Sequence, residues 1–164
     1  MIGVDASSVM LSKARARVPS ADLREGDLVD LPVADDAVDL AVCSLALTHL
    51  ANPAPAIREL ARVVKPGGRI LISDVHPTWV ALGAQACYRS ADERRGFVWN
   101  HVHQVSAYLA WLRGAGLEVL TCDELPYGRE EVDLWAGRLE GAHDVIVDAL
   151  VGLPAALVWQ LARP

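Results

Sequence analysis

The sequence predicts an α/β fold with a mostly parallel sheet, and residues 38–74 carry most of this prediction. Val38 to Leu45 is a short, mostly apolar run between polar segments, as expected of a parallel strand that is covered on both faces. Residues 52–64 repeat apolar side chains at the spacing of one helix face, and a second apolar run follows at residues 70–72. A strand, a helix and a second strand in this order form the unit that connects neighbouring parallel strands.

The helix of this unit has a start signal, a buried stripe and a stop signal. Asn52 is suited to cap the first turn of the helix. Pro53 is tolerated in that turn, because the N–H that proline lacks would have no hydrogen-bond partner within the helix. The sequence KPGG at 65–68 is expected to end the helix, because proline cannot continue it and glycine readily adopts positive φ. The stripe expected to face the sheet is Ile57, Leu60, Ala61 and Val64, and the face expected to meet water is Arg58, Glu59 and Arg62.

The N-terminal residues predict a strand, a helix and an edge strand. Ile2 to Asp5 is suited to the end of a strand, and Ser7 or Ser8 to the cap of the following helix. That helix is expected to bury one face, formed by Met10, Leu11, Ala14 and Val18. Residues 21–27 form a polar strand, as is typical of a sheet edge.

The C-terminal half predicts a helix over 105–112 and strands over 117–122 and 154–162. Residues 130–139 have mixed helical character, and residues 144–147 fit either a strand or a helix. Residues 75–104 lack regular periodicity and contain Trp79, Tyr88, Phe97 and Trp99. Since this segment leaves the carboxyl edge of the sheet, we expect it to form a lid over a ligand, although its aromatic residues would also suit an ordinary loop pinned to the body.

Composition narrows the classes of partner. A chain of 164 residues suits a single domain, and a net charge of −6 without a basic stripe argues against nucleic acid as the partner and leaves a small molecule. The three cysteines are widely spaced, which argues against a disulfide framework and a metal site. No apolar run approaches the ~18 residues of a membrane span, and no signal peptide is recognisable, so we expect a cytoplasmic protein without membrane association.

Asp5 is the first candidate for ligand binding. In open α/β sheets ligands bind at the carboxyl ends of the strands, where a carboxylate can accept hydrogen bonds from the two hydroxyl groups of a ribose. An acidic residue near the start of a helix is also common for structural reasons, so the residue alone leaves both interpretations open.

Four segments together resemble class I S-adenosylmethionine-dependent methyltransferases of the small-molecule type. They are the GVDAS, GDLVDLP and VDLAVCSLALTHL segments and the run ARVVKPGGRILISDVHP. The resemblance implies a Rossmann-like methyltransferase sheet whose closing strand, 154–162, runs antiparallel between strands 70–74 and 117–122. It also implies S-adenosylmethionine as the cofactor and methyl transfer to an O, N or C nucleophile of a small-molecule substrate.

The same resemblance assigns roles to individual residues. Asp5, with Ala6 beside it, is expected at the ribose, and Asp27 at the exocyclic amine of adenine with the backbone N–H of Leu28 at a ring nitrogen. Ser44 and Leu45 are expected to line the methionine part. The candidates for substrate contact or proton transfer are His49, His76, His101 and His103. Each assignment has a plain structural alternative, such as a solvated turn aspartate or a histidine that bonds the loop backbone.

The resemblance also predicts something that the 164 residues do not contain. The family's first strand ends in a G-x-G-x-G loop, and no such motif occurs here. We therefore expect residues 1–164 to form a single, N-terminally truncated domain that binds cofactor poorly, with the missing strand encoded upstream, unless a homodimer compensates for the incomplete sheet. The alternatives are a non-catalytic methyltransferase-like domain and a nicotinamide-dependent reductase, which the absence of G-x-G-x-x-G disfavours.

Overall fold

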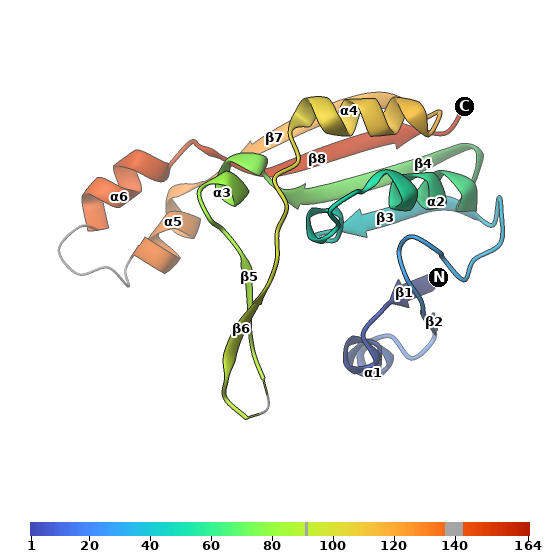
Figure 1. The fold of residues 1–164 in the computed structure, drawn as a ribbon, viewed down its shortest axis with the longest axis horizontal. Helices are drawn as coiled ribbons and strands as arrows, with labels where there is room; N and C mark the ends of the chain where they lie inside the picture. The colour runs from blue at the N-terminus through green and yellow to red at the C-terminus, as the bar shows by residue number, and fades with distance from the viewer. Residues whose placement is uncertain (91, 137–142) are drawn as a thin grey trace.

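The computed structural model describes residues 1–90, 92–136 and 143–164 (Figure 1). Its larger sheet has four strands in the order β3 (Val38–Ser44), β4 (Val64–Val75), β8 (Pro154–Ala162) and β7 (Glu118–Pro126). β3 and β4 are parallel, whereas β8 is antiparallel to both of its neighbours, so β3, β4 and β7 run in one direction. The expected position of the closing strand is confirmed.

A second, two-stranded sheet is formed by β1 (Ile2–Asp5) and β2 (Asp22–Glu25), which are parallel and joined by α1 (Ser8–Arg17). Ser7 caps α1 by accepting a hydrogen bond from the N–H of Met10. The expected apolar face of α1 is wrong in part, because Leu11 is buried whereas Met10 and Val18 are exposed. Among the described strands, β1 and β3 are not paired with each other.

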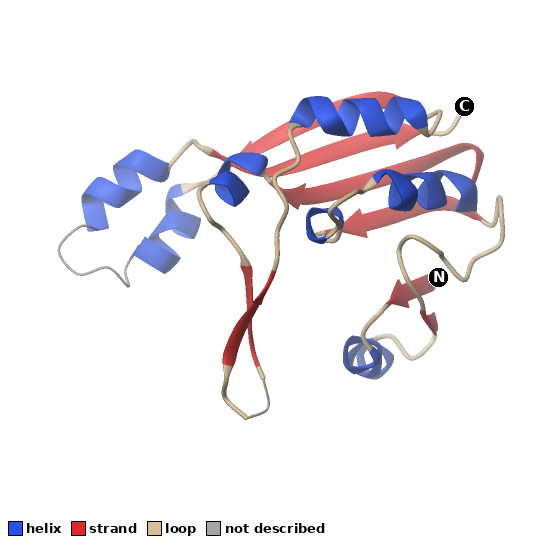
Figure 2. Ribbon diagram, in the orientation of Figure 1, coloured by secondary structure: helices blue, strands red, loops and turns tan. Residues whose placement is uncertain are grey.

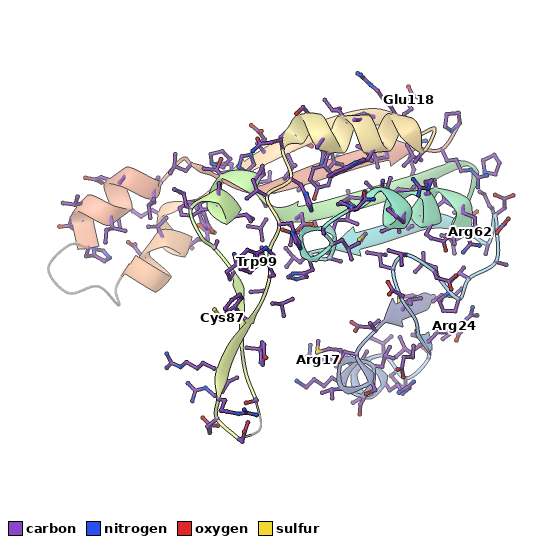
Figure 3. The ribbon with its side chains drawn as sticks, viewed as in Figure 1. Arg17, Arg24, Arg62, Cys87, Trp99 and Glu118 are labelled. Carbon is purple, nitrogen blue, oxygen red and sulfur yellow. The ribbon has the colours of Figure 1, made fainter. Side chains whose placement is uncertain are left out.

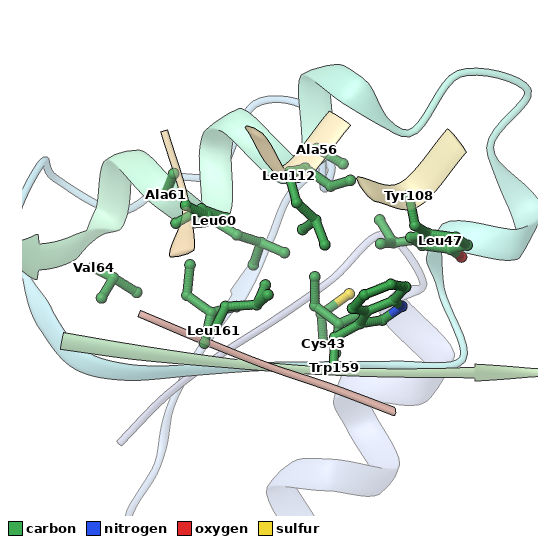
Figure 4. Packing of buried hydrophobic residues seen from close by; sticks show 14 of the residues in the cluster. Cys43, Leu47, Ala56, Leu60, Ala61, Val64, Tyr108, Leu112, Trp159 and Leu161 are labelled. Atoms are coloured by element: carbon green, nitrogen blue, oxygen red, sulfur yellow. The ribbon is translucent and has the colours of Figure 1, made fainter. Parts of the chain in front are cut away.

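Helices α2 (Ala54–Val63) and α4 (Val105–Gly114) pack on one face of the larger sheet (Figure 2). The core lies between these helices and the strands, with Leu60, Ala61 and Leu112 from the helices against Cys43, Trp159 and Leu161 from the sheet (Figure 4). This packing holds the carboxyl end of β3 and the short 3-10 turn η1 (Leu47–His49) that follows it.

The expected end of the second helix is wrong. α2 ends at Val63, because Val64 is already extended (φ −84°, ψ 134°) and pairs with Val38 in the sheet. The KPGG residues 65–68 therefore lie within β4. Gly67 adopts φ +80° and donates its N–H to the carbonyl of Arg163 at 2.7 Å, so the glycine serves a strand-to-strand contact.

The expectation that residues 38–45 are covered on both faces is also wrong. Cys43 is buried under the helices, but Leu40 and Val42 are 57% and 60% exposed. Since side chains alternate along a strand, these two point to the opposite face, and α2 and α4 cover only the first (Figure 2).

Two further parts extend from the larger sheet. Residues 75–104 contain α3 (Pro77–Ala81) and a hairpin of β5 (Ala86–Arg89) and β6 (Arg95–Val98), which projects away from the sheet (Figure 1). α5 (Arg129–Ala136) and α6 (His143–Leu150) lie at one end of β7 and β8 (Figure 1). Residues 144–147, which fitted either a strand or a helix, are part of α6 and are therefore helical. Residues 137–139 of the expected helical stretch lie outside the described residues. None of the helices that the structure describes is long and apolar enough to cross a membrane.

Candidate functional site

A cavity of about 550 Å³ lies between the two sheets, at the carboxyl ends of their strands. It also extends along β1 and β3, past Val4 and Val42. The residues from the sequence analysis that line it are Asp5, Ala6, Asp27, Leu28, Ser44, Leu45 and His49. They come from three separate stretches of the chain, 5–6, 27–28 and 44–49, and the fold brings them to one cavity.

Two carboxylates lie at the part of this cavity formed by the smaller sheet. Asp5 ends β1, and its Oδ1 accepts a hydrogen bond from the N–H of Ser7 at 2.7 Å. Asp27 follows β2, and its Oδ1 accepts from the N–H of Val29 at 3.1 Å. A carboxylate has lone pairs on both oxygens, so each group keeps the capacity to accept further hydrogen bonds from a ligand.

Helix α2 holds the loop that follows Asp27. Glu59 accepts a hydrogen bond from the N–H of Leu31 at 2.8 Å, and Arg62 donates to the carbonyls of Leu31 and Val33 at 3.1 and 2.8 Å. Arg62 also forms an ion pair with Glu59, and its hydrogen bond holds the pKa of that carboxyl below the usual range. The sequence analysis placed both residues on a solvent-facing surface, and no local signal would have revealed this tertiary role.

The carboxyl end of β3 carries backbone strain. Leu45 adopts φ +53°, a region that side chains with a Cβ rarely occupy, and its N–H donates to the carbonyl of Ser73 at 2.8 Å. The hydroxyl groups of Ser44 and Ser73 lie 2.8 Å apart, so one donates to the other. A tightly bonded, strained turn therefore borders the cavity, as is common where a chain approaches a ligand.

A buried carboxylate fixes the turn that carries His49. Asp74 accepts hydrogen bonds from the N–H of Thr48 at 2.8 Å, the N–H of Val75 at 2.9 Å and the hydroxyl of Tyr108 at 3.4 Å. Burial raises the pKa of Asp74 even though the bonds from Thr48 and Val75 oppose this shift. Asp74 is not among the residues that line the cavity, so it positions η1 and does not face a ligand there.

His49 lines the cavity, and its tautomer follows from its partner. Its Nδ1 lies 3.2 Å from the backbone carbonyl of Trp99. A carbonyl can only accept, so Nδ1 carries the proton of the neutral ring and Nε2 has the free lone pair. The ring can therefore take up a proton at Nε2.

The structure places the other candidate histidines elsewhere. His103 is buried and donates through Nε2 to the carbonyl of Leu50 at 2.8 Å, and the ring of His101 stacks on that of His103. His76 accepts the N–H of Thr78 at Nδ1 and donates from Nε2 to Glu124, each at 3.3 Å. It lines a different cavity, of about 480 Å³. Of the four candidates, His49 alone is among the residues that line the larger cavity.

Comparison with known proteins shows a similarity to methyltransferases. The family model described as a methyltransferase domain matches residues 1–72. A curated relative, the demethylmenaquinone methyltransferase of Paenarthrobacter aurescens (strain TC1), is 36% identical over 83 residues. The match covers 48% of this chain and 33% of that protein, and across the curated relatives it spans 24% to 36% of their length.

Solved structures extend the similarity to nearly the whole chain. The S-adenosylmethionine dependent methyltransferase from Mesorhizobium loti superposes with a TM-score of 0.72 at 23% identity, over 99% of this chain and 80% of that one. The putative one from Listeria monocytogenes gives 0.74 at 18% identity, over 99% and 79%. The chain thus has the Rossmann-like fold that the sequence motifs implied. This fold and the similarity of residues 1–72 to the methyltransferase model imply S-adenosylmethionine as the cofactor.

Proposed function

We propose that this chain binds S-adenosylmethionine in the 550 Å³ cavity and transfers its methyl group to an O, N or C nucleophile of a small molecule. One observation carries the proposal: Asp5, Asp27, Leu45 and His49 come from distant segments and line the same cavity. Its volume lies within the range of about 300–1,000 Å³ that is common for ligand pockets. The demethylmenaquinone methyltransferases among the relatives support a small-molecule acceptor.

The chemistry of the cavity suits the nucleoside part of this cofactor. Ribose hydroxyls and the adenine amine are hydrogen-bond donors, and the carboxylates of Asp5 and Asp27 are acceptors. Ala6 and Leu28 supply apolar contact beside them, and Ser44 and Leu45 border the part of the cavity formed by β3. We assign Asp5 to the ribose, Asp27 and Leu28 to adenine, and Ser44 and Leu45 to the methionine part.

The protein's contribution to the reaction is alignment and proton uptake. When bound, S-adenosylmethionine would supply an electrophilic methyl group. His49 would take the proton of an acceptor hydroxyl at Nε2 as that hydroxyl is methylated. The bond from Nδ1 to the Trp99 carbonyl keeps the ring in the tautomer that this step needs.

Calorimetric titration with S-adenosylmethionine tests the binding site. Asp5→Ala removes charge-assisted hydrogen bonds that together contribute about 2–3 kcal/mol, so we expect affinity to fall roughly 30- to 150-fold. The matched control is Asp144→Ala, which removes an exposed carboxylate of α6 that does not line the cavity and should leave affinity unchanged. Equal affinities of the two variants, or no binding to the unmodified protein, would refute the assignment.

A further inference from the structure

The segment after β6 carries a row of aromatic rings on one face. Phe97, Trp99, His101 and His103 are alternate residues of an extended chain, and we call them the aromatic row. Successive ring centroids are 6.0, 6.5 and 6.0 Å apart. Beyond His103 the row continues to the ring of Trp111 at 5.2 Å. The row therefore connects the hairpin to the core.

The two ends of this row differ in burial. His103 is 8% exposed, whereas Phe97 and Trp99 are 55% and 58% exposed. Figure 3 shows Trp99 on the hairpin, nearer to the sheet than Cys87. Aromatic rings gain most by burial, so two adjacent ones left in water are typical of a binding surface.

Hydrogen bonds anchor the backbone of residues 99–101 to the turn that carries His49 and to Gln85. The carbonyl of Trp99 accepts from His49, the N–H of His101 donates to the carbonyl of Thr48 at 2.7 Å, and the N–H of Asn100 donates to the side chain of Gln85 at 2.7 Å. The backbone of the row is thus bonded to the turn that lines the cavity. A surface ordered in this way loses little entropy when it binds a ligand.

We propose that Phe97 and Trp99 bind the methyl acceptor, and that the acceptor is a flat, uncharged aromatic ring system carrying a hydroxyl group. This inference rests on the proposed function. Indole and phenyl faces stack well on flat rings. The carboxylates of Asp5 and Asp27 and the net charge of −6 disfavour an anionic acceptor.

Because His49 is bonded to the backbone carbonyl of Trp99, an acceptor held by the aromatic row is bound next to the turn that carries His49. Its hydroxyl proton passes to Nε2 of His49, the oxygen gains the methyl group, and the sulfur of the cofactor retains the electron pair. The hairpin thus supplies the specificity for ring shape, and the cavity supplies the cofactor.

The test uses 2-naphthol as the probe in calorimetric titrations of the full chain. We expect binding to the unmodified protein, a loss of about tenfold in Trp99→Ala, and partial recovery in Trp99→Phe. The matched control is Tyr88→Ala, because Tyr88 pairs with Gly96 and so lies on the other face of the same hairpin. It should leave affinity unchanged. The anion 2-naphthoate should bind more weakly than 2-naphthol.

The same proteins separate this inference from its alternatives. Equal affinity of Trp99→Ala and the unmodified protein for 2-naphthol would overturn it. So would a lack of naphthol binding together with sedimentation on phosphatidylcholine vesicles that Trp99→Ala abolishes, since the rings would then serve a lipid surface. If S-adenosylmethionine binds and 2-naphthol does not, this inference fails and the proposed cofactor site stands. The reverse result refutes the cofactor site, and with it the role of the bound ring as a methyl acceptor.

Discussion

The tautomer and the position of His49 are set by hydrogen bonds of the backbone around it. Its Nδ1 donates to a carbonyl of the segment after β6, and the N–H of the preceding residue, Thr48, is held by the buried Asp74. Removing Asp74 would therefore act on His49 through the turn, without any contact between Asp74 and a ligand. We therefore propose His49 as the group that contacts the acceptor and Asp74 as a residue that positions the turn.

His49→Gln should lower the rate of methyl transfer by about 100-fold or more, because glutamine cannot take up the proton. The measurement is transfer of labelled methyl groups to a panel of phenols, together with the affinity for S-adenosylmethionine, which should stay within about twofold. His76→Gln is the control, because His76 lines the other cavity. An unchanged rate in His49→Gln would mean that alignment alone suffices.

At the level of elements, α2 supports both the core and the site. Its apolar stripe packs under the sheet, while Glu59 and Arg62 on its other side hold residues 31–33 of the loop after Asp27. The position of Asp27 therefore depends on two side chains that do not reach the ligand. Loss of this support should be visible in stability and in cofactor affinity together.

Arg62→Met should lower the free energy of unfolding by about 1–3 kcal/mol at neutral pH, because the partly buried Glu59 and the two loop carbonyls lose their donor. The lowered pKa of Glu59 sets the pH dependence. Its stabilising effect is complete above the ordinary glutamate pKa of about 4.3 and is lost as the pH falls through the depressed value. Urea unfolding at several pH values measures this. Arg58→Met, on an exposed position of the same helix, should change stability by less than about 0.5 kcal/mol, and a similar loss in both variants would contradict the role of Arg62.

The elements also show what a sequence can and cannot reveal. Ser7 as a helix cap, the stripe of α2 and the extent of β8 were predictable, because each depends on neighbours along the chain. The end of α2 and the exposure of Leu40 were not, since pairing of Val64 with Val38 and the coverage of a sheet face depend on distant residues. The same holds for the site. Asp5 and Asp27 follow from strand ends, whereas the left-handed Leu45 and the bond between His49 and Trp99 have no local signal.

On the scale of the molecule, the candidate site spans two sheets that share no strand pairing in the described chain. The four-stranded sheet is packed against α2 and α4, whereas β1 and β2 pair over only the residues Ile2–Asp5 and Asp22–Glu25. Short two-stranded sheets are marginally stable by themselves. The smaller sheet should therefore open at a lower free energy than the larger one.

Hydrogen–deuterium exchange should show this difference and its dependence on the cofactor. Amide protons of β1 and β2 should exchange at least about tenfold faster than those between β4 and β8, where the pairing runs from Arg69 to Val75 and the helices cover one face. S-adenosylmethionine at 100 times its dissociation constant would stabilise the bound form by about 2.7 kcal/mol, so exchange that requires Asp5 to leave the site should slow by about 100-fold. In Asp5→Ala the same concentration should slow it much less. Two results would contradict this expectation: equal protection of β1 and β4 without cofactor, or protection of β1 that does not change on saturation. Either result would show that the two sheets already move as one unit and that the order of the cavity between them does not depend on a ligand.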